Sequence, residues 1–142
     1  MLAAIPLLLL PAALYNILVL ALLDGGFQSV LADDLMGRRL FVMPMASGGH
    51  WAVNLGDLLT FVTLGILFIE LLKSTTSRKV VIVNHSLSMI LFIACLIEFL
   101  LAPAFATSTF FLLTLMVLLD VLAGFIVTIM SARKDVDFHD RD

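Results

Sequence analysis

The stretch TLMVLLDVLAGFIVTIM, residues 114–130, decides the fold class of this chain. It holds one charged residue, Asp120, among large apolar side chains. Its length is close to the ~20 residues that a helix needs to cross ~30 Å of hydrocarbon. The stretch therefore predicts a membrane helix, and it raises the question of what a carboxylate does inside one.

The composition of the whole chain supports the same class. Of its 142 residues, 62% are hydrophobic and only 13% are charged, whereas an average soluble domain has roughly 25% charged residues. The mean hydropathy is +1.16. Four long apolar runs predict an all-α, four-helix bundle in a single membrane domain covering residues 1–142, with spans at about 2–23, 51–72, 80–102 and 109–130.

The first run is interpreted as a span and not as a cleaved secretory signal. It lacks a basic segment at its start, and its apolar stretch is longer than the usual 7–15 residues. Pro11 lies in its first half and is expected to kink the helix by removing one backbone hydrogen bond.

The positions of Lys and Arg predict the orientation. Six of the eight basic residues lie in the second connection or in the tail, and only Arg38 and Arg39 lie in the first connection. By the positive-inside rule, both termini are cytoplasmic and residues 24–50 are exterior. The mixed charges of the tail, 131–142, predict a short solvated end. The net charge of −3 gives no basic surface for nucleic acid.

The connections differ in length. Segments 74–78 and 105–108 are short and predict antiparallel neighbours. Loops as long as 24–50 are uncommon without structure of their own. We expect a short interfacial helix near 29–39 that ends around Gly37, after the Asp33-Asp34 turn. A flexible re-entry at Ser47-Gly48-Gly49 should follow, and Trp51 should anchor the second span at the headgroup level.

Polar residues within the spans fall at distinct depths. Towards the outside are Asn16, Asp57 and Glu98; towards the inside are Glu70, Asn84 and His85; and Asp120 lies between them.

Small and weakly polar residues recur at helical spacing and predict helix contacts, because they let backbones approach closely. The packing residues are Gly56, Thr60, Thr63, Ser88, Cys95, Gly124 and Thr128. Their spacing turns Asp120 into the bundle or an oligomer seam, away from lipid. Ordinary packing is the preferred interpretation of the Gly, Ser and Thr members.

The acids are harder to explain, since no Lys or Arg lies within a span. Asp120 is either neutral through desolvation, or compensated by a cation, water or a basic group on another subunit. Glu70 is expected to pair with Lys73.

We expect hydrogen bonds at three of the other polar residues. His85 is expected to bond Glu70 across the hairpin between the second and third spans. Glu98 and Asp57 either accept hydrogen bonds from Asn16 or outer-loop amides, or take part in transport; both alternatives stay open.

Enzymatic chemistry is the weakest class. The single cysteine excludes paired thiols, the histidines lie too far apart to ligate haem, and no zinc spacing, phosphate-binding loop or nucleophile elbow occurs. We therefore predict no catalytic residue, no metal and no cofactor.

Two segments, LGDLLTFVTLGILFIELLKST and ATSTFFLLTLMVLLDVLAGFIVTIMSARKD, resemble a group of small uncharacterised four-span bacterial inner-membrane proteins. The resemblance covers about the last two thirds of the chain, from Trp51 onwards. It implies a multi-pass location in the bacterial inner membrane and no activity. Small multidrug transporters place an essential glutamate in the first helix, where this chain has Asn16, so their function is not carried over.

Two functions remain. The first is an accessory or scaffolding subunit, with the lipid bilayer and other membrane subunits, or further copies of itself, as partners. The second is a small oligomeric transporter or a proton- or cation-coupled carrier. In the carrier, Glu98 and Asp57 form an outer vestibule, Asp120 a relay, and Glu70 with His85 an inner exit. The first is favoured, because packing alone explains the small-residue faces.

Overall fold

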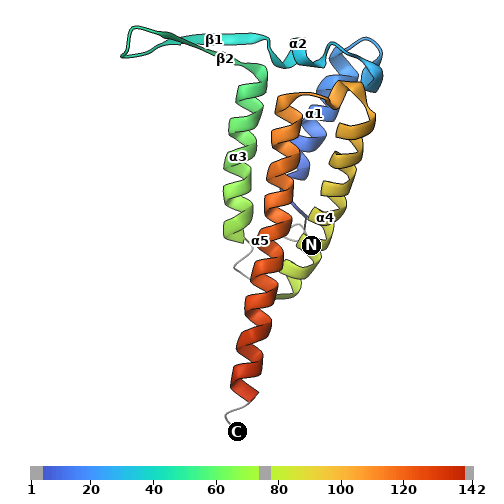
Figure 1. Ribbon diagram of the computed structural model, residues 1–142, viewed down its shortest axis with the longest axis vertical. Helices are drawn as coiled ribbons and strands as arrows, with labels where there is room; N and C mark the ends of the chain where they lie inside the picture. Colours follow the sequence, from blue (N-terminus) through green and yellow to red (C-terminus); the bar gives the residue numbers. More distant parts are fainter. Residues whose placement is uncertain (1–4, 74–77, 140–142) are drawn as a thin grey trace.

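The computed structural model describes residues 5–73 and 78–139, apart from the side chains of residues 78–82, 128 and 130–139. Most of the described chain is helical (Figure 1). Its elements in order are α1 (Leu9–Leu22), η2 (Gly26–Gln28), α2 (Ala32–Met36), β1 (Arg39–Pro44), β2 (His50–Asn54), α3 (Leu55–Lys73), α4 (Arg78–Leu101), η3 (Pro103–Phe105) and α5 (Ser108–His139).

Within the described residues, three helices are long and apolar enough to cross a membrane. They are α3, the Val83–Leu101 part of α4 and the Ser108–Val127 part of α5. Their outward faces carry large exposed apolar side chains; Phe68 is 64% exposed and Leu100 67%. Surface of this kind needs lipid or protein to cover it. The fold is that of a helical membrane protein.

Helix α1 is shorter than the expected helix over 2–23. Its 14 residues extend about 21 Å at 1.5 Å per residue, which is less than the hydrocarbon thickness. The helix begins at Leu9, so Pro11 lies in its first turn, where backbone N–H groups have no helical acceptor in any case. The predicted loss of a hydrogen bond within the helix, which was the reason to expect a kink at Pro11, is therefore wrong. Residues 1–4 of the expected span lie outside the described chain.

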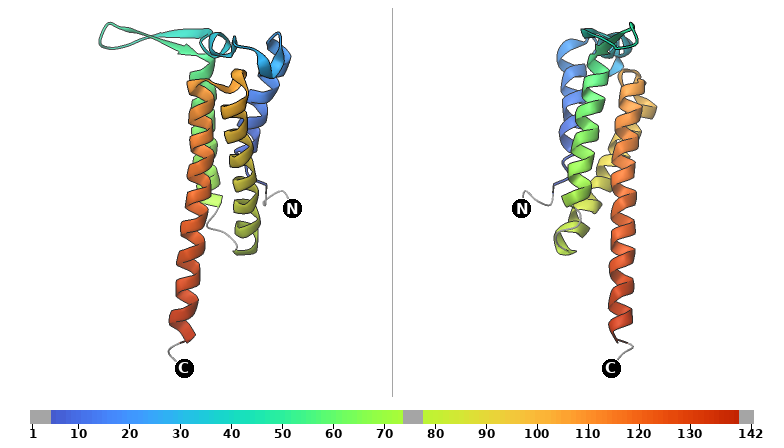
Figure 2. Two further views of the ribbon diagram at one scale, coloured as in Figure 1. Left: turned by 45° about the vertical axis from the view of Figure 1, so that its right-hand side comes forward. Right: turned by 90° about the vertical axis from the view of Figure 1, so that its left-hand side faces the viewer.

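Helix α5 packs along both α3 and α4, and α1 lies beside them (Figure 2). Helices α4 and α5 are antiparallel neighbours joined through η3, as the short connection predicted. The expected connection 74–78 lies outside the described residues, except for Arg78 at the start of α4. An aromatic cluster closes the α4–α5 end of the core: the ring of Tyr15 lies 4.7 Å from Phe110, and Phe105 lies 4.7 Å from Phe110.

The segment 24–50 contains the short helix that was expected, over fewer residues. Helix α2 occupies Ala32–Met36 and ends at Gly37, whose N–H donates to Asp33 O at 2.8 Å. Ala32, Leu35 and Met36 are buried, so this helix covers the end of the helical core.

A β-hairpin follows α2, and the sequence analysis did not predict it. Strand β1 pairs antiparallel with β2, with Val42 opposite Ala52 and Met43 opposite Trp51. The segment 47–49, expected as a flexible re-entry, forms the turn of this hairpin, where Gly48 has a φ of +84°. The hairpin projects sideways from the end of the helices (Figure 1).

Two boundaries near the membrane ends also differ from expectation. Trp51 lies in β2 and α3 begins only at Leu55; the Trp51 ring still contacts Phe61 of α3, at 6.0 Å between centroids. At the other end, α5 continues to His139, well past the expected boundary at 130 (Figure 2). The part of the predicted tail up to residue 139 is thus helical, and residues 140–142 lie outside the described chain.

Candidate functional site

Asp120 lies in the seam between α5 and α4. Its side chain is fully buried, and Ser88 Oγ donates a hydrogen bond to Asp120 Oδ2 at 2.6 Å. This position agrees with the expected one, inside the helices and away from lipid. The other carboxylate oxygen, Asp120 Oδ1, is buried and has no hydrogen-bond partner.

His85 lies one helical turn further along the same seam. Both of its ring nitrogens are buried without a hydrogen-bond partner. The imidazole ring lies against Gly124, where a Cβ on the glycine would overlap three ring atoms. Ser88 faces Asp120 and His85 faces Gly124, so the two pairs form successive levels of one antiparallel helix contact.

A second polar cluster, which we call the Glu70 cluster, joins Glu70, Lys73, Asn84 and the backbone of residues 5–7. Glu70 is fully buried and accepts hydrogen bonds from Asn84 Nδ2 at 2.5 Å and from the Leu7 N–H at 2.8 Å. Lys73 Nζ lies 3.3 Å from Glu70 Oε1, which confirms the predicted pair. It also donates to Ile5 O at 2.8 Å and to Asn84 Oδ1 at 3.3 Å.

The predicted hydrogen bond between His85 and Glu70 is wrong. Asn84 bonds Glu70, whereas the nitrogens of His85 have no partner. Consecutive helical residues point about 100° apart, so Asn84 turned towards α3 leaves His85 turned towards α5.

The outer acids make local hydrogen bonds of the kind expected for a structural role. Asn16 Nδ2 donates to Glu98 Oε2 at 3.3 Å, and also to Ala12 O at 3.1 Å. Asp57 accepts the backbone N–H of Asn54 at 3.0 Å, in the first turn of α3. Asp57, Glu98 and Asp120 therefore have their partners on three different parts of the fold. This arrangement favours separate roles over the single outer-to-inner path that a carrier needs.

The predicted packing residues lie mostly on buried faces. Gly56 is buried where a Cβ would meet Thr109 Oγ1 and Met36, which holds α3 close to both α5 and α2. Thr60 and Thr63 donate to Gly56 O at 2.8 Å and to Leu59 O at 2.7 Å in their own helix. The buried members of the set are Gly56, Thr63, Ser88, Cys95 and Gly124. The side chain of Thr128 lies outside the description.

Sequence reasoning missed a contact at the other end of the seam. Tyr15 is fully buried, and its hydroxyl donates to Ala104 O at 3.0 Å and shares a 2.7 Å hydrogen bond with Thr107 Oγ1. This contact ties α1 to the connection between α4 and α5. Tyr15 is the only tyrosine of the chain, inside an apolar run, and a buried phenol needs a hydrogen-bond partner.

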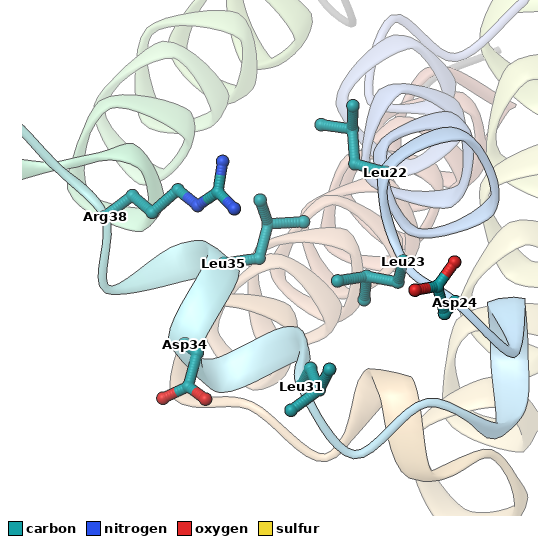
Figure 3. A pocket seen from close by; sticks show the side chains of 7 residues that line it. All are labelled: Leu22, Leu23, Asp24, Leu31, Asp34, Leu35 and Arg38. Carbon is teal, nitrogen blue, oxygen red and sulfur yellow. The ribbon is translucent and has the colours of Figure 1, made fainter.

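A hollow of about 360 Å³ lies between α1 and α2. Arg38 and Asp24 lie on opposite sides of it (Figure 3). The remaining lining residues are Leu22, Leu23, Leu31, Asp34 and Leu35. None of the seven polar residues that the sequence places within the spans lines this hollow. Across the described side chains, no three His, Cys, Asp or Glu residues are grouped to hold a metal ion.

Comparison with known proteins yields no relative from which a role could be transferred. No family model matches the chain, and no curated protein and no solved structure is similar to it.

Proposed function

We propose that this chain is a non-enzymatic, four-span protein of the bacterial inner membrane that serves as an accessory or scaffolding subunit of a larger membrane complex. The observation that carries the proposal is the β-hairpin. Every residue of β1 is exposed, including Leu40, Phe41, Val42 and Met43 at 42–47%. A lone two-stranded hairpin is marginally stable in water, and one that exposes apolar side chains along a whole strand needs a partner surface.

The position of the hairpin suits an interface with a neighbouring membrane protein. It extends sideways from the end of α3, beyond the outline of the helices (Figure 1). The Trp51–Phe61 contact, made near the turn end of β2, holds the hairpin beside a face of α3 that exposes Phe61 and Val62 at 49% and 48%. A partner seated there would cover part of α3 and the hairpin together.

The length of residues 5–22, measured against α3, supports four spans. Lys73, at one end of α3, binds Ile5 O, and Glu70 binds the Leu7 N–H. At its other end the first segment leads through η2 to α2, which packs on α3. Residues 5–22 therefore cover the same thickness as α3, although only 14 of them are helical. With four crossings and six basic residues on one side, both termini are cytoplasmic in this proposal.

Purification in mild detergent tests the proposal. We expect the tagged chain to carry a second membrane protein at fixed stoichiometry, and Val42→Asp in β1 to release that protein. Val30→Asp is the matched control, because Val30 is 80% exposed in the exterior segment but lies outside the hairpin. The release should occur with an unchanged melting temperature.

A self-contained, monodisperse chain that behaves identically as wild type and as Val42→Asp would overturn the proposal. So would release of the partner by both valine variants to the same extent, because the hairpin would then have no specific part in the contact.

A further inference from the structure

In the part of the chain that the structure describes, the buried carboxyl group of Asp120 has no ion-pair partner. Among the described side chains, the titratable and charged groups around the seam are Glu70 and Lys73 on α3, His85 on α4 and Asp120 on α5. Lys73 is paired with Glu70 at 3.3 Å. A carboxylate at Asp120 beside a neutral His85 would place a negative charge in the seam that has no ion pair among the described side chains, and an unpaired charge is costly away from water.

Polar atoms of both Asp120 and His85 are buried in the seam without hydrogen-bond partners. Asp120 is fully buried and its Oδ1 lacks a donor, while both nitrogens of His85 lack partners. A neutral imidazole has one N–H donor and one acceptor nitrogen, and a carboxylate has acceptors only. Buried polar atoms without partners are rare and call for an explanation.

The spacing allows one bound proton to satisfy these atoms. His85 precedes Ser88 by three residues and Gly124 follows Asp120 by four, so the two levels of the seam are separated by about 4.5–6 Å along the helix axes. A single water, with hydrogen bonds of about 2.8 Å on each side, spans that separation.

We propose that Asp120 and His85 together form a proton-binding site, which holds one exchangeable proton between Asp120 Oδ1 and the imidazole ring. Binding converts carboxylate plus proton to carboxylic acid, or imidazole plus proton to imidazolium, and in either form the Asp120–His85 pair carries no net charge. Ser88 is a positioning residue, because its hydroxyl donates to Oδ2 and leaves Oδ1 available for the proton. The proposal is independent of the accessory-subunit function.

The bound proton can be counted spectroscopically in purified protein at neutral pH. The chain has three histidines, His50, His85 and His139, so a His50→Gln/His139→Gln protein retains His85 alone for nitrogen NMR. Infrared spectroscopy of the same protein reports the carbonyl band of a protonated carboxylic acid. We expect one proton per chain, seen as a carboxylic-acid band or as an imidazolium signal of His85.

Asp120→Asn is the decisive variant. The asparagine preserves the shape of the side chain and an acceptor for the Ser88 hydroxyl. The variant should abolish the carboxylic-acid band or the imidazolium signal, whichever the wild type shows. Asp57→Asn, at the start of α3, is the control and should leave that signal unchanged. If Asp120→Asn does not fold, Asp120→Glu replaces it and should shift the carboxylic-acid band or the imidazolium signal. A wild-type seam that contains a carboxylate and a neutral imidazole overturns the proposal. A signal that is identical in the Asp120 and Asp57 variants does so as well.

Discussion

The imidazole ring of His85 lies against the backbone of Gly124, in the space that a Cβ at that position would occupy. The close approach of α4 and α5 at this level therefore depends on a residue without a side chain. The same contact places His85 one helical turn from Asp120. Helix packing and the polar site therefore both require a residue without a side chain at position 124.

Gly124→Ala should destabilise the protein, because the new methyl group overlaps the ring of His85. Overpacking of this kind costs about 1–3 kcal/mol. The measurement is the free energy of unfolding in detergent. Gly65→Ala is the matched control, since Gly65 lies in α3 with no atom within 4 Å of its Cβ position, and alanine there should be neutral or stabilising by up to about 1 kcal/mol.

The double variant Gly124→Ala/His85→Ala identifies the obstacle. If the ring is what the methyl group meets, the two changes should compensate in part and their effects should not add. Additive losses would mean that the glycine is required for another reason.

Tyr15→Phe should lower stability while leaving the aromatic packing in place. The variant keeps the ring against Phe110, but it leaves Ala104 O without the hydroxyl that donates to it at 3.0 Å. A buried carbonyl that loses its donor costs about 1–3 kcal/mol. The thermal unfolding of purified protein measures this loss.

Thr107→Ser serves as the control for Tyr15→Phe. It retains the oxygen that bonds Tyr15 and also accepts the Phe110 N–H at 3.2 Å, so stability should stay close to that of the wild type. Equal melting temperatures for Tyr15→Phe and the wild type would show that the hydroxyl contributes nothing to holding α1.

Hydropathy predicted the long helices because a membrane span needs only length and apolar composition. It also predicted that Asp120 faces inwards, since the Asp120–Gly124 spacing places a small residue on the same face. It failed for residues 39–54, where apolar and polar residues do not alternate strictly, so the two short strands of the hairpin have no period-2 signal. The bulge between Arg39 and Phe41 interrupts the register further.

Which residues form hydrogen bonds between two helices was harder to predict than which residues share one face of a helix. Lys73 was correctly paired with Glu70, because both lie on α3 three residues apart. Asn84 and His85 are adjacent on α4, and only the rotation of that helix decides which of them meets α3. The sequence contains no information on that rotation beyond the small-residue stripe, and the wrong neighbour was chosen for Glu70.

Lys73→Met should destabilise the protein by removing the cation beside Glu70. Breaking a buried pair costs roughly 3–5 kcal/mol, and because the Lys73 side chain remains 23% exposed, we expect the lower end of that range. The same change removes the hydrogen bond to Ile5 O, so residues preceding α1 should exchange amide hydrogen faster. Unfolding and hydrogen exchange measure the two effects.

Two further variants separate charge from packing at this site. Lys73→Arg keeps the positive charge and should retain most of the stability. Glu70→Gln/Lys73→Met removes both charges while Asn84 and the Leu7 N–H can still bond the glutamine oxygen, so it should be more stable than Lys73→Met alone. A double variant no more stable than Lys73→Met would contradict a role of Lys73 in neutralising Glu70.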